Sequence, residues 1–296
     1  MAGAKEIKNR INSIKDTRKI TNAMYLIASV KMKKAKEDLD HTRPYFDALR
    51  EEIKRIFRTA QDIDSRFFYP VGAKEPEDGT YGCLVITGDK GLAGAYNHTV
   101  IKTAEEFYKK HPDTVFFTVG EYGRQHFIRH KMPIDREFRF SSQNPTMYRA
   151  REISAALLSR FEEQKLDKIY VIYTDLKNGM MSRCITTRLL PFDREQFSKL
   201  MEEDSSFSPF EFTPSLTAVL DGVMPSYLSG FIYGALVDSF CSEQSARMAA
   251  MKSADDNADK ILFRLSTEYN RVRQAAITRE ITEVSSGAMA QKKNRR

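Results

Sequence analysis

The sequence predicts an α/β fold: a long antiparallel two-helix coiled coil, formed by the N- and C-terminal helices, plus a central Rossmann-like α/β domain. Three observations support this prediction. Residues 4–59 contain no glycine and one proline, so the N-terminal end favours a helix. Residues 226–296 contain no proline, which favours a second long helix. Between these ends, β-branched segments alternate with helical ones, as is typical of βαβ units in a largely parallel sheet.

The N-terminal helix is predicted from apolar residues at spacings of three and four, which we interpret as one stripe. The apolar positions are Ile7, Ile11 and Ile14, then Ile20, Met24 and Ile27 in a shifted phase, and Lys31 continues the spacing. At about 1.5 Å per residue the helix would measure about 84 Å, whereas a globule of this chain length is only about 50 Å across. It therefore cannot fit inside a globule. Pro44 should kink the helix or remove a hydrogen bond.

The C-terminal helix is expected to begin with Thr213 as its N-cap and Pro214 at the first helical position. Pro225 should bend it. Further along, the 4-3 spacing of a coiled-coil seam is followed by Ala258, Leu262, Leu265, Tyr269, Val272 and Ala276. Close approach of the two helices is favoured by Ala246, Ala249, Ala250, Ala254 and Ala258.

The middle of the chain is predicted to form the α/β domain. The expected strands are Tyr81–Thr87, Thr114–Val119, Lys168–Thr174 and Ser182–Leu190, and the expected helices are Gly94–Lys110, Glu121–His130 and Pro145–Glu163. Segments 64–80 and 202–214 carry Pro, Gly, Ser and acidic residues, as links do. We expect three parts: a helix over 1–60, the α/β domain over 61–212, and a helix with a short basic tail over 213–296.

Composition excludes several functional classes. Three widely spaced cysteines (Cys83, Cys184 and Cys241) give no disulfide framework and no zinc-binding spacing. His126 and His130 stand four residues apart, but without a third ligand we interpret them as surface residues. No apolar run approaches the roughly 20 residues of a membrane span, and the charged N-terminus is unlike a signal peptide. We therefore expect no metal, no cofactor, no catalytic residue and no membrane insertion.

A glycine-rich turn, Gly88–Asn97, follows the first predicted strand, where phosphate-binding loops occur. Its spacing is neither GxGxxG nor GxxxxGK[ST]. One interpretation is a nucleotide-binding enzyme. We favour the other, a tight turn in which glycine permits close packing.

The net charge is +7, and residues 1–36 hold ten basic residues against two acidic ones. This charge fits a solvated helix face, a nucleic-acid-binding surface, or a basic shaft inside an acidic protein collar. Composition alone leaves all three open.

Five blocks of sequence resemble the gamma-subunit family of F-type ATP synthases. They occur in the family's order and span nearly the whole chain: Glu6–Ile14, Thr17–Met24, Gly88–Asn97, Ser242–Met251 and Tyr269–Ile281. The resemblance implies a non-catalytic rotor in the central stalk, which couples ion flow to ATP synthesis from ADP and phosphate, reversibly. The transported ion would be a proton or, alternatively, sodium. The c-ring and stator chains, rather than this chain, would select it. The alternative function is a basic coiled-coil scaffold or nucleic-acid-binding protein.

The resemblance also implies partners and contact residues. The partners would be the alpha and beta subunits of the catalytic head, the epsilon subunit and the membrane c-ring, with no nucleic acid. The protein would be peripheral, on the cytoplasmic face of a bacterial cell membrane. Contacts with the beta subunit are implied for Met24, Arg273, Gln274, Thr278 and Glu280, and foot contacts with the c-ring or epsilon for Phe210, Phe212 and Thr213. Thr213 replaces a glutamate common in the family, and Gln291–Arg296 extend the usual C-terminus.

Overall fold

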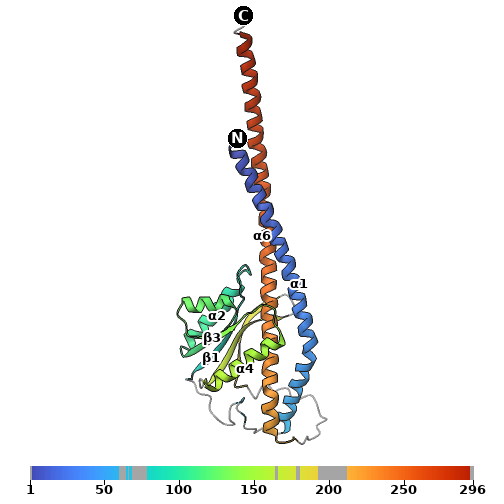
Figure 1. The fold of residues 1–296 in the computed structure, drawn as a ribbon, viewed down its shortest axis with the longest axis vertical. Helices are drawn as coiled ribbons and strands as arrows, with labels where there is room; N and C mark the ends of the chain where they lie inside the picture. Colours follow the sequence, from blue (N-terminus) through green and yellow to red (C-terminus); the bar gives the residue numbers. More distant parts are fainter. Residues whose placement is uncertain are drawn as a thin grey trace. The chain divides into compact units, whose positions relative to one another are not determined.

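The computed structural model describes residues 2–59, 65, 67–68, 79–163, 166–177, 181–192 and 212–293. Contacts divide the chain into two compact units. Residues 1–28 and 248–296 form the first, here called the coiled-coil unit, and residues 29–247 form the second, the α/β unit. Helices α1 (Ala2–Thr59) and α6 (Leu216–Lys293) each contribute to both units (Figure 1). The chain therefore has the predicted class, a mixed α/β fold with a long helix toward each end.

In the coiled-coil unit, the predicted seam of α6 is confirmed. Every residue of its 4-3 series is buried or half-buried, and the series starts two steps earlier than predicted: Met251, Asp255, Ala258, Leu262, Leu265, Tyr269, Val272 and Ala276. Ala249 and Ala254 are exposed, so their assignment to the close approach was wrong. They stand outside the 4-3 series, and Asp255 occupies the seam instead.

The stripe of α1 in this unit differs from the prediction. From Ile7 onward, its half-buried or buried positions are Ile7, Ile11, Ile14, Thr21, Met24, Tyr25 and Ala28. Ile20 and Ile27 are 60% and 56% exposed, so they do not belong to the seam. The 4-3 series that begins at Ile7 passes through Thr21 and Ala28, and the apolar residues one position earlier therefore face outward. The residues predicted as one stripe therefore form two: a buried stripe in the seam, and an outward-facing stripe that contains Ile20 and Ile27.

An ion-pair cluster joins the two helices of the coiled-coil unit. Arg18 donates from Nε to Asp255 Oδ1 at 2.9 Å and pairs with Asp259 at 2.6 Å. Tyr25, which follows Arg18 along α1, lines a shallow hollow with Met251, which precedes Asp255 along α6. Later residues of α1 therefore meet earlier residues of α6, so the helices of this unit are antiparallel. Because these side chains are 34% to 53% exposed, the pairs add little stability, and we assign them a role in fixing register.

The α/β unit contains a five-stranded sheet with the order β3-β2-β1-β4-β5. Its strands are β1 (Tyr81–Ile86), β2 (Thr114–Val119), β3 (Ile134–Phe140), β4 (Lys168–Lys177) and β5 (Met181–Leu190). The pairs β1–β2, β1–β4 and β2–β3 are parallel, and β4–β5 is antiparallel. The largely parallel sheet is thus confirmed.

Helices cover both faces of this sheet (Figure 1). Cys83 and Val85 of β1 pack with α2 (Tyr96–Lys110) and α3 (Glu121–Arg129) on one face. Leu84 and Ile86 point the other way, toward α4 (Met147–Glu163) and the first half of α6. The alternation follows from the two-residue period of a strand. Both faces of β1 are buried, so it has the continuous apolar sequence of a central parallel strand.

The predicted start of α6 was wrong, and one strand was missed. Helix α6 begins at Leu216, and Ser215, not Thr213, caps it: Ser215 Oγ accepts a hydrogen bond from the backbone N–H of Ala218 at 3.2 Å. Strand β3 was not predicted, because four of the seven residues in its sequence IDREFRF are charged. Both long helices continue through their prolines, Pro44 and Pro225. Within the described residues, no helix is long and apolar enough to cross a membrane.

Candidate functional site

The glycine-rich turn after β1 contacts helix α6. The backbone N–H of Gly88 donates to Asn97 Oδ1 at 2.8 Å, which ties the start of the turn to α2. A Cβ on Gly88 would lie 2.8 Å from Glu243 Oε1, so only glycine allows α6 to approach this closely. Arg247 of α6 donates to the carbonyl of Gly91 at 3.1 Å. These contacts support the packing interpretation of the turn over the nucleotide-binding one.

Glu243 and Arg247 form an ion pair against this turn. Their side chains are 1% and 12% exposed, and Arg247 Nη2 donates to Glu243 Oε1 at 2.6 Å. Burial raises the pKa of Glu243, and Arg247 opposes that shift. Asp89 strengthens the turn from the other side, because its Oδ1 accepts a hydrogen bond from the backbone N–H of Glu121 at the start of α3. The ion pair therefore fixes α6 to the carboxyl end of the sheet.

Replacing Arg247 by Ala should lower the free energy of unfolding by about 3 kcal/mol at pH 8, because it leaves a buried carboxylate without its cation. The pKa of Glu243 is already raised in the folded chain, and the replacement raises it further. Stability of the variant should therefore fall as pH rises from the ordinary range of a glutamate through this raised value. Urea unfolding at pH 5 and pH 8 measures both effects.

The matched control is Lys33→Ala, which breaks an exposed ion pair with Glu37 on α1. It should cost less than about 0.5 kcal/mol at either pH. An equal loss in both variants would show that the Glu243–Arg247 pair has no special role in the α/β unit.

Four of the five residues expected to contact the beta subunit lie on one exposed region of α6. Arg273, Gln274, Thr278 and Glu280 are all exposed. Among the described residues, neither Arg273 nor Glu280 makes an ion pair, so both charged groups are available to a partner.

Exposed apolar residues, which sequence reasoning missed, share this surface. Ile277, Ile281 and Val284 are 47%, 63% and 74% exposed. Arg273, Ile277, Glu280 and Val284 follow spacings of 4, 3 and 4, so they form one stripe on the helix. We call this set with Gln274, Thr278 and Ile281 the terminal stripe. Contiguous exposed apolar residues bordered by polar groups are typical of protein interfaces. Their positions outside the 4-3 seam were the available sequence signal.

Met24 of α1 is half-buried and lies between Ile20 and Ile27 of the outward-facing stripe. That stripe and the terminal stripe both belong to the coiled-coil unit. Of the expected foot residues, Phe212 packs on the large core cluster of the α/β unit, and Thr213 is exposed. Phe210 lies outside the described residues. The contacts assigned to all these residues stay predictions.

His126 and His130 form a stacked pair at the end of α3. Their rings stack with centroids 4.0 Å apart, and His126 Nε2 lies 2.9 Å from Glu105 Oε1. His130 Nδ1 lies 2.8 Å from the carbonyl oxygen of His126. Across the described part of the chain, no group of three potential ligands could hold a metal ion.

Comparison with known proteins extends these observations to the whole chain. The family described as ATP synthase matches residues 3–290. An ATP synthase gamma chain of Caldanaerobacter subterraneus is 40% identical, over 97% of this chain and 99% of the relative. One from Acetivibrio thermocellus is 38% identical, over 99% and 100%. A gamma chain of Acetobacterium woodii, described as sodium ion specific, is 36% identical, over 96% and 97%.

Solved structures share the fold. A chain in the OSCP/F1/c-ring structure of the Euglena gracilis mitochondrial ATP synthase aligns with a TM-score of 0.66 at 16% identity, over 100% of this chain and 96% of that chain. A chain in the central stalk and c-ring structure of the Tetrahymena thermophila enzyme aligns with a TM-score of 0.57 at 22% identity, over 79% and 99%. On its full-length similarity to curated relatives, this chain belongs to the ATP synthase gamma chain family.

Proposed function

We propose that this chain is the central-stalk rotor of an F-type ATP synthase and transmits ion-driven rotation to the catalytic head. The terminal stripe carries this proposal. It places Arg273 and Gln274 on an exposed helix surface beside Ile277 and Ile281, where a surrounding subunit can contact them. The chain itself would be non-catalytic, and the chemistry would take place in partner subunits.

The mechanism rests on asymmetry. A single chain has no internal symmetry, so it presents a different surface to each of three identical catalytic subunits. On α6 the charged and apolar residues of the terminal stripe occupy one side, whereas Arg264 and Glu268 occupy another. The angle of the shaft therefore biases each catalytic site toward a different conformation, and by linkage nucleotide binding biases the angle.

The proposed partners are the alpha and beta subunits around the coiled-coil unit, and the epsilon subunit and c-ring around the α/β unit. The outward-facing residues Ile20 and Ile27, with half-buried Met24 between them, would provide a second contact for the head. The complex would lie on the cytoplasmic face of a bacterial membrane, with this chain as a peripheral component. Protons or sodium ions would drive it, according to the chains that select the ion.

Native mass spectrometry of the tagged chain, purified gently from its own cells, tests the proposal. We expect a complex containing one copy of this chain and three copies each of two larger subunits. Recovery of the chain alone, or as a homodimer, under conditions that keep the catalytic head intact would contradict the rotor function.

A further inference from the structure

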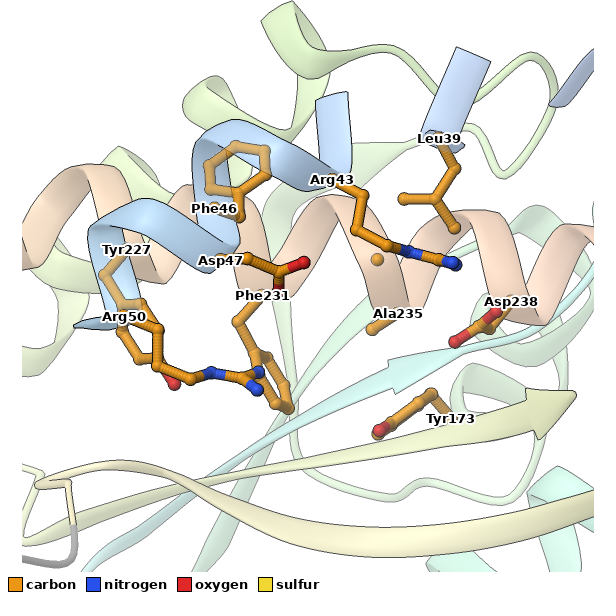
Figure 2. Close-up of a pocket in the computed structure, with 12 residues that line it drawn as sticks. Leu39, Arg43, Phe46, Asp47, Arg50, Tyr173, Tyr227, Phe231, Ala235 and Asp238 are labelled. Carbon is orange, nitrogen blue, oxygen red and sulfur yellow. The ribbon is translucent and has the colours of Figure 1, made fainter. Parts of the chain in front are cut away.

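A cavity of about 250 Å³ opens in the α/β unit, between α1, α6 and β4 (Figure 2). Its wall on α1 includes Arg43, Phe46 and Arg50, and its opposite wall includes Phe231 of α6 and Tyr173 of β4. None of these residues belongs to the terminal stripe or to the glycine-rich turn. The cavity is thus a separate feature of the molecule.

Two glycines of α6 explain why the space exists. A Cβ on Gly230 would lie 2.1 Å from the ring of Phe46, so this ring already fills the space beside Gly230. A Cβ on Gly234, one turn later, would have no atom within 4 Å. The space over Gly234 is therefore open, and aromatic side chains border it. Tyr173 and Phe231 meet edge to face there, with centroids 6.1 Å apart.

The charged groups at the cavity are mostly basic on the α1 side. Arg43 and Arg50 stand seven residues apart on one face of α1, and in Figure 2 both side chains extend from that helix toward the cavity. Arg43 pairs with Asp40 at 3.3 Å, but both side chains are about 60% exposed, so the pair is weak. Within the described residues, Arg50 makes no ion pair. Its guanidinium can therefore bind an added anion.

We propose that this cavity binds a small aromatic anion, whose ring packs among Phe46, Phe231 and Tyr173 and whose acidic group pairs with Arg50 or Arg43. Edge-to-face and stacked aromatic contacts would hold the ring. The planar guanidinium suits a carboxylate, sulfonate or phosphate, because it donates two parallel hydrogen bonds. The cavity volume lies just below the usual range of ligand pockets, which limits the ligand to one or two rings.

The acidic groups at the cavity predict how binding depends on pH. Asp238 of α6 lines the cavity, and burial together with the neighbouring Asp175 raises its pKa to about 6, against opposing effects of Arg43 and Lys36. Asp47 is the other carboxylate of the lining. At neutral pH the two carboxylates offset the two arginines. Protonation of Asp238 removes one negative charge, so affinity for an anion should rise about fivefold between pH 7.5 and pH 5.5.

Titration calorimetry of the full chain with 2-naphthalenesulfonate, which stays anionic throughout this pH range, tests the proposal. We expect one saturable site with a Kd of about 1 mM or below at pH 5.5. Gly234→Leu should fill the cavity and weaken binding at least tenfold. The control Gly222→Leu changes another α6 glycine at which an added Cβ would have no atom within 4 Å, and it should leave binding unchanged.

Charge variants distinguish binding at this site from nonspecific binding. They test the proposal even if Gly234→Leu does not fold. Arg50→Gln should weaken binding about tenfold, whereas Arg55→Gln, further along α1, should not. Asp238→Asn should bind at pH 7.5 as the native chain does at pH 5.5. The neutral analogue 2-naphthalenemethanol and inorganic sulfate should each bind more weakly than the probe. Binding that is absent in the native chain, or equal in native chain, Arg50→Gln and Gly234→Leu, would overturn the proposal.

Discussion

Replacing Gly120 by Ala should unfold or severely destabilise the α/β unit. Gly120 joins β2 to α3 with φ at +94°, a conformation that residues with a side chain rarely adopt. A Cβ there would lie 2.2 Å from the carbonyl oxygen of Thr87, at the end of the central strand β1. Backbone must move to relieve this clash, because no flexible side chain can give way. We expect a loss of more than about 4 kcal/mol in the free energy of unfolding.

The matched control is Gly222→Ala on α6, where a Cβ meets no atom within 4 Å. Alanine favours a helix interior over glycine, so this variant should gain up to about 1 kcal/mol. Urea unfolding followed by circular dichroism compares the two variants with the native chain. If Gly120→Ala unfolded at the same urea concentration as the native chain, the inference that Gly120 packs too closely against Thr87 to accept a Cβ would be wrong.

Elements with a strong repeating pattern were predictable from sequence. The seam from Ala258 to Ala276 was predicted residue by residue, because a sustained 4-3 repeat of apolar residues is typical of a coiled coil. Strand β2, Thr114–Val119, was predicted with its bounds, since both of its faces are buried and all six of its residues are β-branched or aromatic. In these cases local pattern and tertiary burial agree.

Elements whose residues lie on an exposed surface were not predictable from sequence. Strand β3 lies at the edge of the sheet, so Arg136, Glu137 and Arg139 mask its strand pattern. Ile20 and Ile27 were assigned to the seam because apolar residues on a helix usually face its partner within the chain. A residue that contacts another subunit has the same apolar character. Sequence pattern identifies the side chain as apolar without revealing which neighbour covers it.

The residues of the candidate site were also predicted only in part. Resemblance predicted Arg273 and Gln274, whereas the apolar part of the terminal stripe became visible only once the helix surface was known. Glu243 was part of a matching block, but its burial against Gly88 depends on contact between residues 155 positions apart (243 minus 88). Such a long-range contact leaves no periodic signal in sequence, and neither does the cavity over Gly234.

Replacing both Arg273 and Gln274 by Ala should lower the rate of coupled ATP synthesis by the assembled complex at least tenfold. Both side chains are exposed, so the folded chain loses no contact of its own, and its unfolding should shift by less than about 0.5 kcal/mol. A hydrogen bond from a charged group to a partner contributes about 1.5–3 kcal/mol. Loss of one such bond in the rotating complex is sufficient for a tenfold change in rate. Membrane vesicles carrying the variant complex allow ATP synthesis, ATP hydrolysis and ion pumping to be measured together.

The control pair is Arg264→Ala with Glu268→Ala, two exposed residues that precede the terminal stripe along α6. This variant removes the same number of exposed polar side chains from the same helix. If α6 acts only as a stiff shaft, both double variants should behave alike, because neither changes the seam. If the terminal stripe is the surface that contacts the catalytic subunits, only the Arg273 and Gln274 variant should lose turnover. Unchanged synthesis and pumping in that variant would remove Arg273 and Gln274 from the coupling contact, and it would leave Ile277, Ile281 and Val284 as the residues to replace next.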